Sequence, residues 1–312
     1  MRIAVAVIFL FCLLLLSSCS GEKKGATKPA FTIGFSQCNS SEPWREAMNK
    51  QIQAEAALHP EITLLISDAQ QANEKQIADV ENFMVRDVDL LMISPNEAKP
   101  LTAVVEKAYD KGIPVIVIDR KILSDKYTCF IGADNKLIGR EAGKLSARLL
   151  HGKGSVVEIW GLKGSTPAIE RHDGFMEGIK DFPDIQIIYA QDGAWLRDRG
   201  KSIMENALQR FEKIDLVYGH NDPMAMGAYL AAKYSGRAKK IFFIGIDGLP
   251  GAEGGIQAVA NGELNATFVY PTGGAIAVQT AVKILNKQTV DKNITLETMQ
   301  VDSSNAKALL EH

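Results

Sequence analysis

From Phe31 onward, short apolar runs rich in β-branched residues alternate with longer segments whose apolar residues recur at three- and four-residue spacing. The first pattern predicts buried strands and the second predicts amphipathic helices. We expect strands at 31–35, 63–66, 90–93, 115–118, 128–131, 156–160, 186–189, 216–218, 241–246 and 266–269, and a last one near 296–301. Helices are expected at 44–58, 71–86, 100–111, 137–150, 168–180, 197–211, 223–234 and 274–285. Because the strands are almost continuous Val, Ile and Leu, they should be covered on both faces, as parallel strands joined by helical crossovers are.

The rhythm breaks once near the middle of the chain. No helix pattern separates the runs at 115–118 and 128–131, and the segment Ile131-Gly132-Ala133-Asp134-Asn135 follows directly. The strands are also too many for one sheet, so we place a crossover between two domains near Ala133. The pattern therefore predicts an α/β protein with two Rossmann-like lobes, whose ligand side is the carboxyl end of the strands.

The N-terminus has the character of a targeting signal. Met1-Arg2 is followed by an apolar run to Leu16, which is short for a membrane span and suits a signal peptide. Leu16-Ser17-Ser18-Cys19 resembles a bacterial lipobox, so residues 1–19 are expected to be a signal peptide, Cys19 a lipid anchor and 20–30 a polar tether. An uncleaved signal anchor and an ordinary cleavage site remain open. Of the four cysteines, Cys38 and Cys129 are expected to be unpaired.

Composition and charge narrow the possible functions. Lys+Arg number 35 and Asp+Glu 37, which gives a net charge of −2, and no basic cluster is present, so a nucleic-acid partner is not expected. A hydrophobic content of 46% with 23% charged residues is typical of a globular protein.

Cofactor and metal motifs are absent from the sequence. In Gly161-Leu162-Lys163-Gly164-Ser165-Thr166 the lysine precedes the second glycine, so the order required of a phosphate loop is missing. The glycines at 251–255 and 273–274 lack the spacing of a dinucleotide fingerprint. The five histidines do not pair with Cys or carboxylates at ligand spacing, and no Gly-x-Ser-x-Gly motif occurs. We expect no cofactor and no metal.

Polar and aromatic side chains gather where the predicted strands end. In chain order they are Gln37, Asn39, Trp44, Arg45, Asp119, Arg120, Asp134, Asn135, Arg171, Trp195, Asn221, Asp222, Asp247 and Tyr270. Carboxylates and amides accept hydrogen bonds from vicinal hydroxyls, guanidinium groups donate two in a plane, and indole rings stack on the C–H face of a sugar. Such a site fits a small neutral polyol.

Each of these residues also has a purely structural interpretation. Asp119 and Arg120 could form an ion pair at the end of a strand, and Asn221 with Asp222 could cap the next helix. Trp44 and Trp195 could belong to the core. Their common position at strand ends is what favours a binding site.

Several motifs together resemble the periplasmic sugar-binding proteins of the ribose/galactose type. They are Gly34-Phe35-Ser36-Gln37, Glu42-Pro43-Trp44-Arg45, Val117-Ile118-Asp119-Arg120, Ile131-Gly132-Ala133-Asp134-Asn135, Glu170-Arg171-His172-Asp173-Gly174-Phe175, Gly219-His220-Asn221-Asp222-Pro223-Met224-Ala225-Met226-Gly227-Ala228 and Gly245-Ile246-Asp247-Gly248. The resemblance covers nearly everything after residue 30. Trp44-Arg45 together with Asp119-Arg120 is most similar to members that bind furanose sugars.

This resemblance implies a type I periplasmic binding protein with three hinge crossings and the ligand between its lobes. The lobes would be 31–133 plus 272–295 and 134–271 plus 296–312. Trp44 and Trp195 would stack on the sugar, and polar contacts would come from Gln37, Arg45, Asp119, Arg120, Asn135, Arg171, Asn221 and Asp247. Tyr270 stands where ribose binders have a glutamine, which puts the identity of the sugar in doubt.

The implied function is binding of a monosaccharide in the periplasm, with fructose, ribose or galactofuranose as examples, and closure of the lobes on it. The membrane partner would be the permease of an ABC transporter or a histidine kinase, and the only link to the membrane an N-terminal lipid or anchor. The lipobox favours a free lipoprotein. Residues 305–312 read as the start of a helix cut short and end in Leu-Glu-His, which resembles an expression tag, so the sensor domain of a hybrid two-component system stays equally open. The alternative function is that of a glycosidase using Asp119 and Asp247, but Arg120 and Arg171 should lower the pKa of both carboxyl groups.

Overall fold

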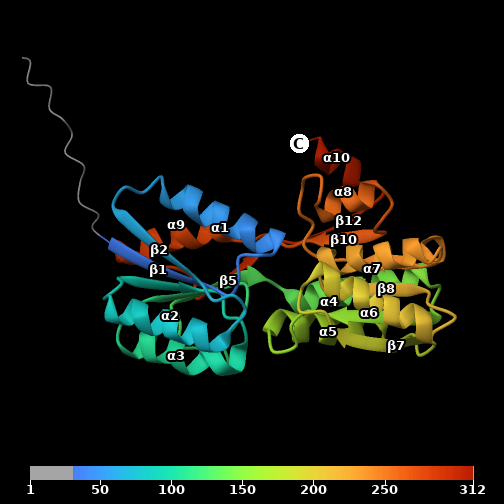
Figure 1. Cartoon of the computed structure of the whole chain (residues 1–312). Coiled ribbons are helices and arrows are strands. Elements are labelled where there is room, and N and C mark those ends of the chain that lie inside the picture. Colours follow the sequence, from blue (N-terminus) through green and yellow to red (C-terminus); the bar gives the residue numbers. More distant parts are fainter. Residues whose placement is uncertain (1–30, 312) are drawn as a thin grey trace, which may run out of the picture.

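The computed structural model describes residues 31–311, which form two α/β lobes side by side (Figure 1). The expected signal peptide, Cys19 and the tether lie outside the described residues. Each lobe contains a six-stranded sheet, with strand orders β11-β5-β4-β3-β1-β2 and β12-β10-β9-β8-β6-β7. The strands within each sheet are parallel except β12, which runs antiparallel to β10. The prediction of two lobes with parallel sheets is confirmed.

The N-terminal lobe is built from the first five strands, and the chain returns to it later to add one more helix and one more strand. Its strands are β1 (Phe31–Gln37), β2 (Ile62–Asp68), β3 (Leu90–Ile93), β4 (Val115–Ile118), β5 (Cys129–Ala133) and β11 (Asn293–Leu296). Its helices are α1 (Pro43–Ala56), α2 (Asn73–Val85), α3 (Ala98–Asp110) and α9 (Gly274–Leu285). The α1 and α9 helices cover one face of the sheet, and α2 and α3 cover the other (Figure 1).

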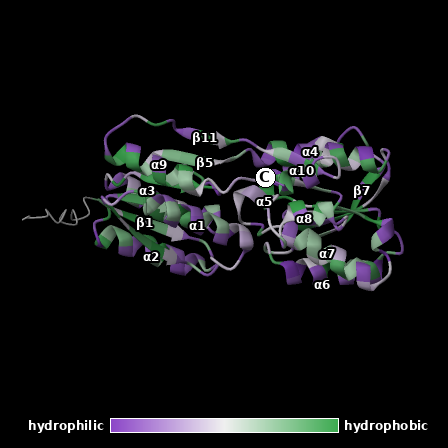
Figure 2. Cartoon of the chain, turned by 90° about the horizontal axis from the view of Figure 1, so that it is seen from above, coloured by the Kyte–Doolittle hydropathy of each residue, from purple (hydrophilic) through white to green (hydrophobic). Residues whose placement is uncertain are grey.

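The C-terminal lobe contains the remaining elements. Its strands are β6 (Gly154–Trp160), β7 (Ile185–Asp192), β8 (Leu216–Gly219), β9 (Phe242–Ile244), β10 (Ala266–Val269) and β12 (Met299–Asp302). Its helices are α4 (Asn135–Leu149), α5 (Thr166–Ile179), α6 (Arg197–Arg210), α7 (Asp222–Tyr234), α8 (Gly255–Ala260) and α10 (Ala306–Leu310), with a 3₁₀ turn at Ala238–Lys240. Apolar residues of both lobes line the faces between sheets and helices, and polar residues lie outside (Figure 2).

Three segments connect the lobes: β5 to α4, β10 to α9, and β11 to β12. The last of these corrects an expectation, because the single strand predicted near 296–301 is two strands in different sheets. Leu296 pairs with Ala133 in the first sheet, and Met299 pairs with Val269 in the second. An apolar run gives no sign of which sheet each of its residues joins.

Helices α4 and α5 approach each other closely because of four glycines. A Cβ on Gly139 would lie 2.2 Å from the carbonyl oxygen of Arg171, and one on Gly174 would lie 2.1 Å from that of Lys136. Gly143 and Gly178 are equally tight against Phe175 and Arg140. This contact fixes the backbone of Arg171 at the interlobe end of α5.

Candidate functional site

A cavity of about 300 Å³ lies between the two lobes, at the carboxyl ends of their strands. Its walls combine guanidinium groups, carboxylates and aromatic rings from both lobes. The residues that line it are Glu42, Trp44, Arg45, Asp119, Arg120, Pro167, Arg171, Trp195, Asn221, Asp247 and Tyr270. A cleft with a few polar groups converging from both lobes suits a small polar ligand.

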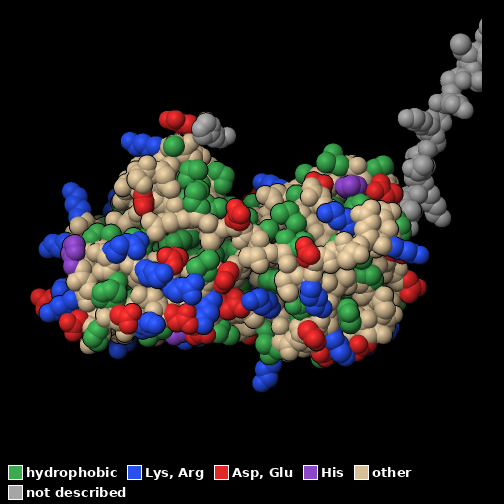
Figure 3. Space-filling model, turned by 180° about the vertical axis from the view of Figure 1, so that it is seen from behind, with side chains coloured by type: hydrophobic (Ala, Val, Ile, Leu, Met, Phe, Trp, Pro, Cys, Tyr) green, Lys and Arg blue, Asp and Glu red, His purple; other side chains and the backbone are tan. Residues whose placement is uncertain are grey.

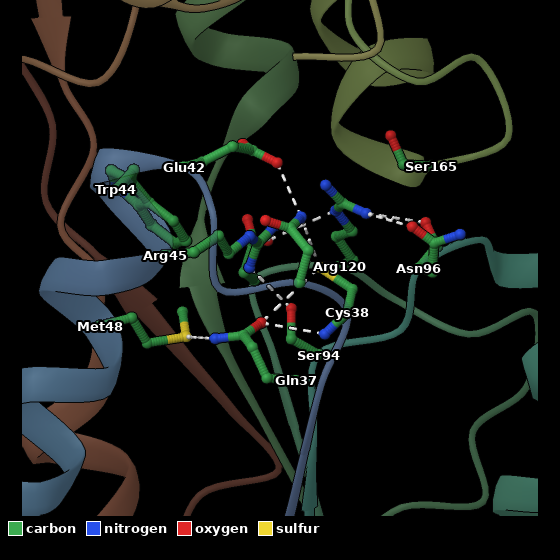
Figure 4. A network of polar contacts seen from close by, with 12 residues as sticks. Gln37, Cys38, Glu42, Trp44, Arg45, Met48, Ser94, Asn96, Arg120 and Ser165 are labelled. Atoms are coloured by element: carbon green, nitrogen blue, oxygen red, sulfur yellow. Dashed lines mark hydrogen bonds and ion pairs between the residues drawn. The ribbon is translucent and has the colours of Figure 1, made fainter. Parts of the chain in front are cut away.

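Two arginines of the N-terminal lobe are held in place around Asp119, and Figure 4 shows Arg45 near Ser94 and Arg120 near Asn96. Arg45, in the first turn of α1, donates to Asp119 Oδ2 at 2.6 Å and to Ser94 Oγ at 2.9 Å. Arg120 donates to the carbonyl oxygen of Asn96 at 2.8 Å, and its Nε lies 3.7 Å from Asp119 Oδ2. Burial alone would raise the pKa of Asp119, but the two guanidinium groups hold it below its ordinary value. Asp119 is therefore a buried, ionised acceptor.

Arg171 supplies the matching cation from the C-terminal lobe. Its Nε donates to Asn135 Oδ1 at 2.8 Å, and one terminal nitrogen donates to the carbonyl oxygen of His220. Asn221 follows His220 and caps α7, because its Oδ1 accepts from the N–H of Met224 at 3.0 Å. Its amide nitrogen donates to the carbonyl oxygen of Trp195 at 3.0 Å. The capping interpretation of Asn221 is thus correct, although the residue also lines the cavity.

Trp195 is placed by a strained backbone. Ala194 and Trp195 have φ of 48° and 70°, a region that costs non-glycine residues about 1–3 kcal/mol each and that concentrates at functional sites. The guanidinium carbons of Arg120 and Arg171 lie 5.5 Å and 5.4 Å from the ring centroid. On the other side the ring touches Gly161, where a Cβ would come within 2.2 Å of it. The indole therefore has a fixed position between two cations and a glycine.

Trp44 and Tyr270 join the N-terminal lobe to the hinge. Trp44 Nε1 donates to the carbonyl oxygen of Tyr270 at 2.7 Å, and the two ring centroids are 5.3 Å apart. The Tyr270 hydroxyl donates to Asp119 Oδ1 at 2.8 Å and accepts from the amide of Asn135 at 3.2 Å. Tyr270 therefore connects carboxylate and amide groups on both sides of a crossing.

Asp247 is the acidic group of the C-terminal lobe that faces the cavity. Its backbone bonds to Phe268 and Tyr270 on the neighbouring segment at 3.0 Å and 2.9 Å. Burial raises its pKa well above the ordinary value, nearby Asp222 raises it further, and Arg171 opposes both effects only in part. The expectation that the arginines would lower the pKa of both carboxyl groups is therefore correct for Asp119 and wrong for Asp247.

Three buried N–H groups of cavity-lining residues have no hydrogen-bond partner within residues 31–311. They are Arg45 Nε, Arg120 Nε and Trp195 Nε1. A buried donor without a partner costs about 1–3 kcal/mol. A ligand rich in oxygen atoms would satisfy them.

Of the residues that were predicted to contact the ligand, all line the cavity except Gln37 and Asn135. Gln37 donates to Asn49 Oδ1 at 2.8 Å and accepts from the N–H of Cys38 (Figure 4), and Asn135 orients Arg171. Glu42 and Pro167 line the cavity but were not predicted. Ser94 and Asn96, which hold the two N-terminal-lobe arginines, were not predicted either, although their position just after β3 is the same signal that indicated the other residues.

Cys38 and Cys129 are both free and buried, as expected. Over residues 31–311 there is no group of three or more side chains that could hold a metal ion. No helix in that range is long and apolar enough to span a membrane.

Comparison with known proteins agrees with this geometry. The galactofuranose-binding protein YtfQ of Escherichia coli is 36% identical over 91% of this chain and 92% of its own length. The ribose import binding protein RbsB of Bacillus subtilis is 34% identical over 95% and 97%. Among solved structures, the fructose-binding periplasmic domain of a hybrid two-component system is 50% identical, with a TM-score of 0.88 over 90% of this chain and 93% of that domain. The periplasmic binding protein domain matches residues 33–289, and the chain belongs to this family.

Proposed function

We propose that the protein binds one monosaccharide in its furanose form between the lobes and that the lobes close on it. The observation that carries this proposal is the set of unpartnered donors, Arg45 Nε, Arg120 Nε and Trp195 Nε1, around a single small cavity. Ring and exocyclic oxygens of a sugar would accept from them, while Asp119 and Asp247 would accept from its hydroxyl groups. Relatives named for galactofuranose, ribose and fructose support the same ligand class.

Calorimetry against a panel of fructose, ribose, arabinose, galactose and xylose tests the ligand class. We expect at least one sugar to bind with a dissociation constant near micromolar, equivalent to about 8 kcal/mol. Absence of heat with every sugar, together with binding of an amino acid or a nucleotide, would contradict the proposal. A crystal structure of the complex then decides the ring form, because a pyranose in the cavity excludes the furanose assignment.

The role in the cell is proposed to be periplasmic, with the closed form recognised by a membrane protein. The relatives differ here, since one is named for ribose import and another is the sensor domain of a two-component system. Deletion of the gene distinguishes the two possible membrane partners. Loss of uptake of the labelled sugar indicates an ABC permease, whereas loss of the sugar-dependent transcriptional response with normal uptake indicates a histidine kinase.

Tethering through Cys19 is a separate proposal, supported by the sequence Leu16-Ser17-Ser18-Cys19. Labelling of the wild-type protein with a fatty acid in cells, and loss of the label in a Cys19→Ser variant, is the expected result. A protein that carries no label contradicts lipidation without affecting the sugar site.

We also propose that the protein is not an enzyme. The raised pKa of Asp247 beside a low-pKa Asp119 is a pattern that glycosidases use, so this alternative has one observation in its favour. The relatives nevertheless carry the names of binding proteins. Incubation with nitrophenyl glycosides of the bound sugar should release no nitrophenol, and turnover lost in Asp247→Asn would establish the enzyme instead.

A further inference from the structure

Three hydrogen bonds join the two lobes outside the cavity. The N–H of Ala98 donates to the carbonyl oxygen of Gly164 at 3.1 Å, and the N–H of Lys121 donates to Thr166 Oγ1 at 2.8 Å. Lys121 Nζ also donates to Glu170 Oε1 at 2.6 Å. Ala98 and Lys121 belong to the N-terminal lobe and the three acceptors to the C-terminal lobe, and none of these five residues lines the cavity.

Both sides of this contact are anchored within their own lobes. Ala98 is the first residue of α3, so its N–H has no acceptor within the helix and uses Gly164 instead. The segment after Lys121 is fixed to α3 by a bond of 2.9 Å from the N–H of Leu123 to Thr102 Oγ1. Thr166 is the first residue of α5, directly before the cavity-lining Pro167.

The lobes also approach each other closely at this point. A Cβ on Gly164 would lie 1.7 Å from Glu97 Oε2, so the carboxylate of one lobe rests against the backbone of the other. Glu97 is held there by the amide of Asn73, which donates to its Oε1 at 2.7 Å. The contact is therefore a close-packed junction between the lobes.

Bonds of this kind can form only when the lobes are together, and they need no ligand to form. They therefore favour the closed state of the empty protein, whereas the sugar favours it through the cavity. When the binding-competent state is a minor population, the apparent dissociation constant is the intrinsic one divided by the fraction of molecules in that state. A change in this fraction alters the affinity for every ligand by the same factor.

We propose that Lys121, Thr166 and Glu170, with the Ala98–Gly164 bond, form an interlobe latch that sets the affinity for sugar without touching it. This inference rests on the proposed sugar-binding function, but the population shift that it describes does not depend on which ligand binds. The latch residues are positioning residues, because they act through the relative placement of the lobes.

Conservative variants test the latch. Thr166→Val removes the hydroxyl acceptor and keeps the side-chain shape, and Glu170→Gln removes the charge opposite Lys121. The matched control is Glu177→Gln, because Glu177 lies on the same helix and pairs with Lys136 within one lobe. The readouts are the dissociation constants of at least two sugars, the sugar dissociation rate, and hydrogen exchange of the Ala98 amide in sugar-free protein by NMR.

The double variant Thr166→Val with Glu170→Gln should bind every sugar about five-fold more weakly, equivalent to about 1 kcal/mol. Dissociation should be faster, and the Ala98 amide, which neither substitution touches, should exchange faster than in the wild type and in Glu177→Gln. Unchanged Ala98 exchange overturns the latch, and so does a loss of affinity that differs between sugars. If the wild-type protein binds no sugar, the proposed function fails, while the exchange comparison still decides whether the latch exists.

Discussion

At the scale of single residues, Asp247 is the most informative side chain because its environment opposes its charge. Replacement by Asn should weaken sugar binding by about 2–4 kcal/mol, since it removes a carboxylate acceptor for hydroxyl groups and one of the two acidic groups near Arg171. Calorimetry measures the loss, and thermal unfolding should show an intact fold. Asp181→Asn on the surface is the control. Affinity equal to that of the wild type would place the ligand elsewhere.

The same residue predicts how binding depends on pH. Hydroxyl donors favour the ionised carboxylate, whereas burial and Asp222 raise the pKa of Asp247 and so favour its protonated form. Affinity should therefore fall as the pH is lowered, starting well above the ordinary pKa of 3.8. Titration of the dissociation constant against pH checks this. A slope that persists in Asp247→Asn would mean that another group is responsible.

Gly161 offers a second test at this scale, because it limits where Trp195 can lie. In Gly161→Ala the new methyl group would push the indole toward the cavity, so sugar affinity should drop by about 1–3 kcal/mol. Unfolding experiments should show a loss of stability as well, because Arg120 and Arg171 limit how far the ring can move. The control is the double variant with Trp195→Phe, whose smaller ring should restore stability but not affinity. Unaltered binding in Gly161→Ala would show that Trp195 does not contact the ligand.

At the scale of elements, Glu158 links β6, β8 and α5 beneath the cavity. Its buried carboxylate lies 2.9 Å from His172 Nδ1 and 3.1 Å from His220 Nε2. Burial would raise its pKa, but these two hydrogen bonds hold it at about 2, and the bond to Glu158 in turn raises the pKa of His172. Burial lowers the pKa of His220, which is therefore a neutral donor.

Glu158→Gln should lower the free energy of unfolding at pH 7 by about 2–3 kcal/mol. The carboxylate has a depressed pKa in the folded state, so its contribution is complete above 4.5 and disappears as the pH falls toward about 2. Denaturant unfolding of the wild type should therefore lose stability in that window, and the variant should lose less. Glu177→Gln, on the surface, should leave the stability almost unchanged. Equal stability of Glu158→Gln and wild type would contradict the linkage.

Sequence periodicity was sufficient for most elements but not for their ends. The strands at 115–118 and 216–218 were predicted almost as they are, because a short apolar run after an amphipathic helical pattern indicates a buried strand. The pattern failed at 296–301, where neighbouring apolar residues join different sheets. It also gave no separate helix at Gly255–Ala260, where glycines mask a single helical turn.

The candidate site was predictable to the extent that strand ends define it. Arg120 and Asp247 directly follow apolar runs and do line the cavity, whereas Gln37 has the same kind of position and turns toward α1. The direction of a side chain depends on backbone angles that the sequence does not display. The raised pKa of Asp247 was equally out of reach, because it comes from burial and from Asp222, which other elements bring close.

At the scale of the whole molecule, Tyr270 connects the lobes at a hinge crossing. Tyr270→Phe removes the bonds to Asp119 and Asn135 while keeping the ring, so both lobes should remain folded. Affinity should fall by about 1–2 kcal/mol, because Tyr270 no longer fixes the positions of Asp119 and of Asn135, which orients Arg171. Calorimetry with the preferred sugar measures this, and Tyr234→Phe on the surface is the control. A variant with wild-type affinity would restrict Tyr270 to a packing role.

Charged residues of both signs are mixed over the surface of the molecule (Figure 3). Lys and Arg are interspersed with Asp and Glu on the face shown in Figure 3, and several pairs lie within one lobe, such as Lys126 with Asp110. Exposed pairs of this kind contribute little to stability. Added salt should therefore change the free energy of unfolding only slightly. It should weaken the Lys121–Glu170 pair between the lobes somewhat more.

The return of the chain to its first lobe has a consequence for biosynthesis. Helix α9 and strand β11 come from residues 274–296, and without them α1 has no partner on its face of the sheet and β5 forms an open edge. A nascent chain therefore cannot complete its first lobe until residues 274–296 have been translated. Until then the lobe has an uncovered apolar face and an unpaired strand edge, which favour aggregation.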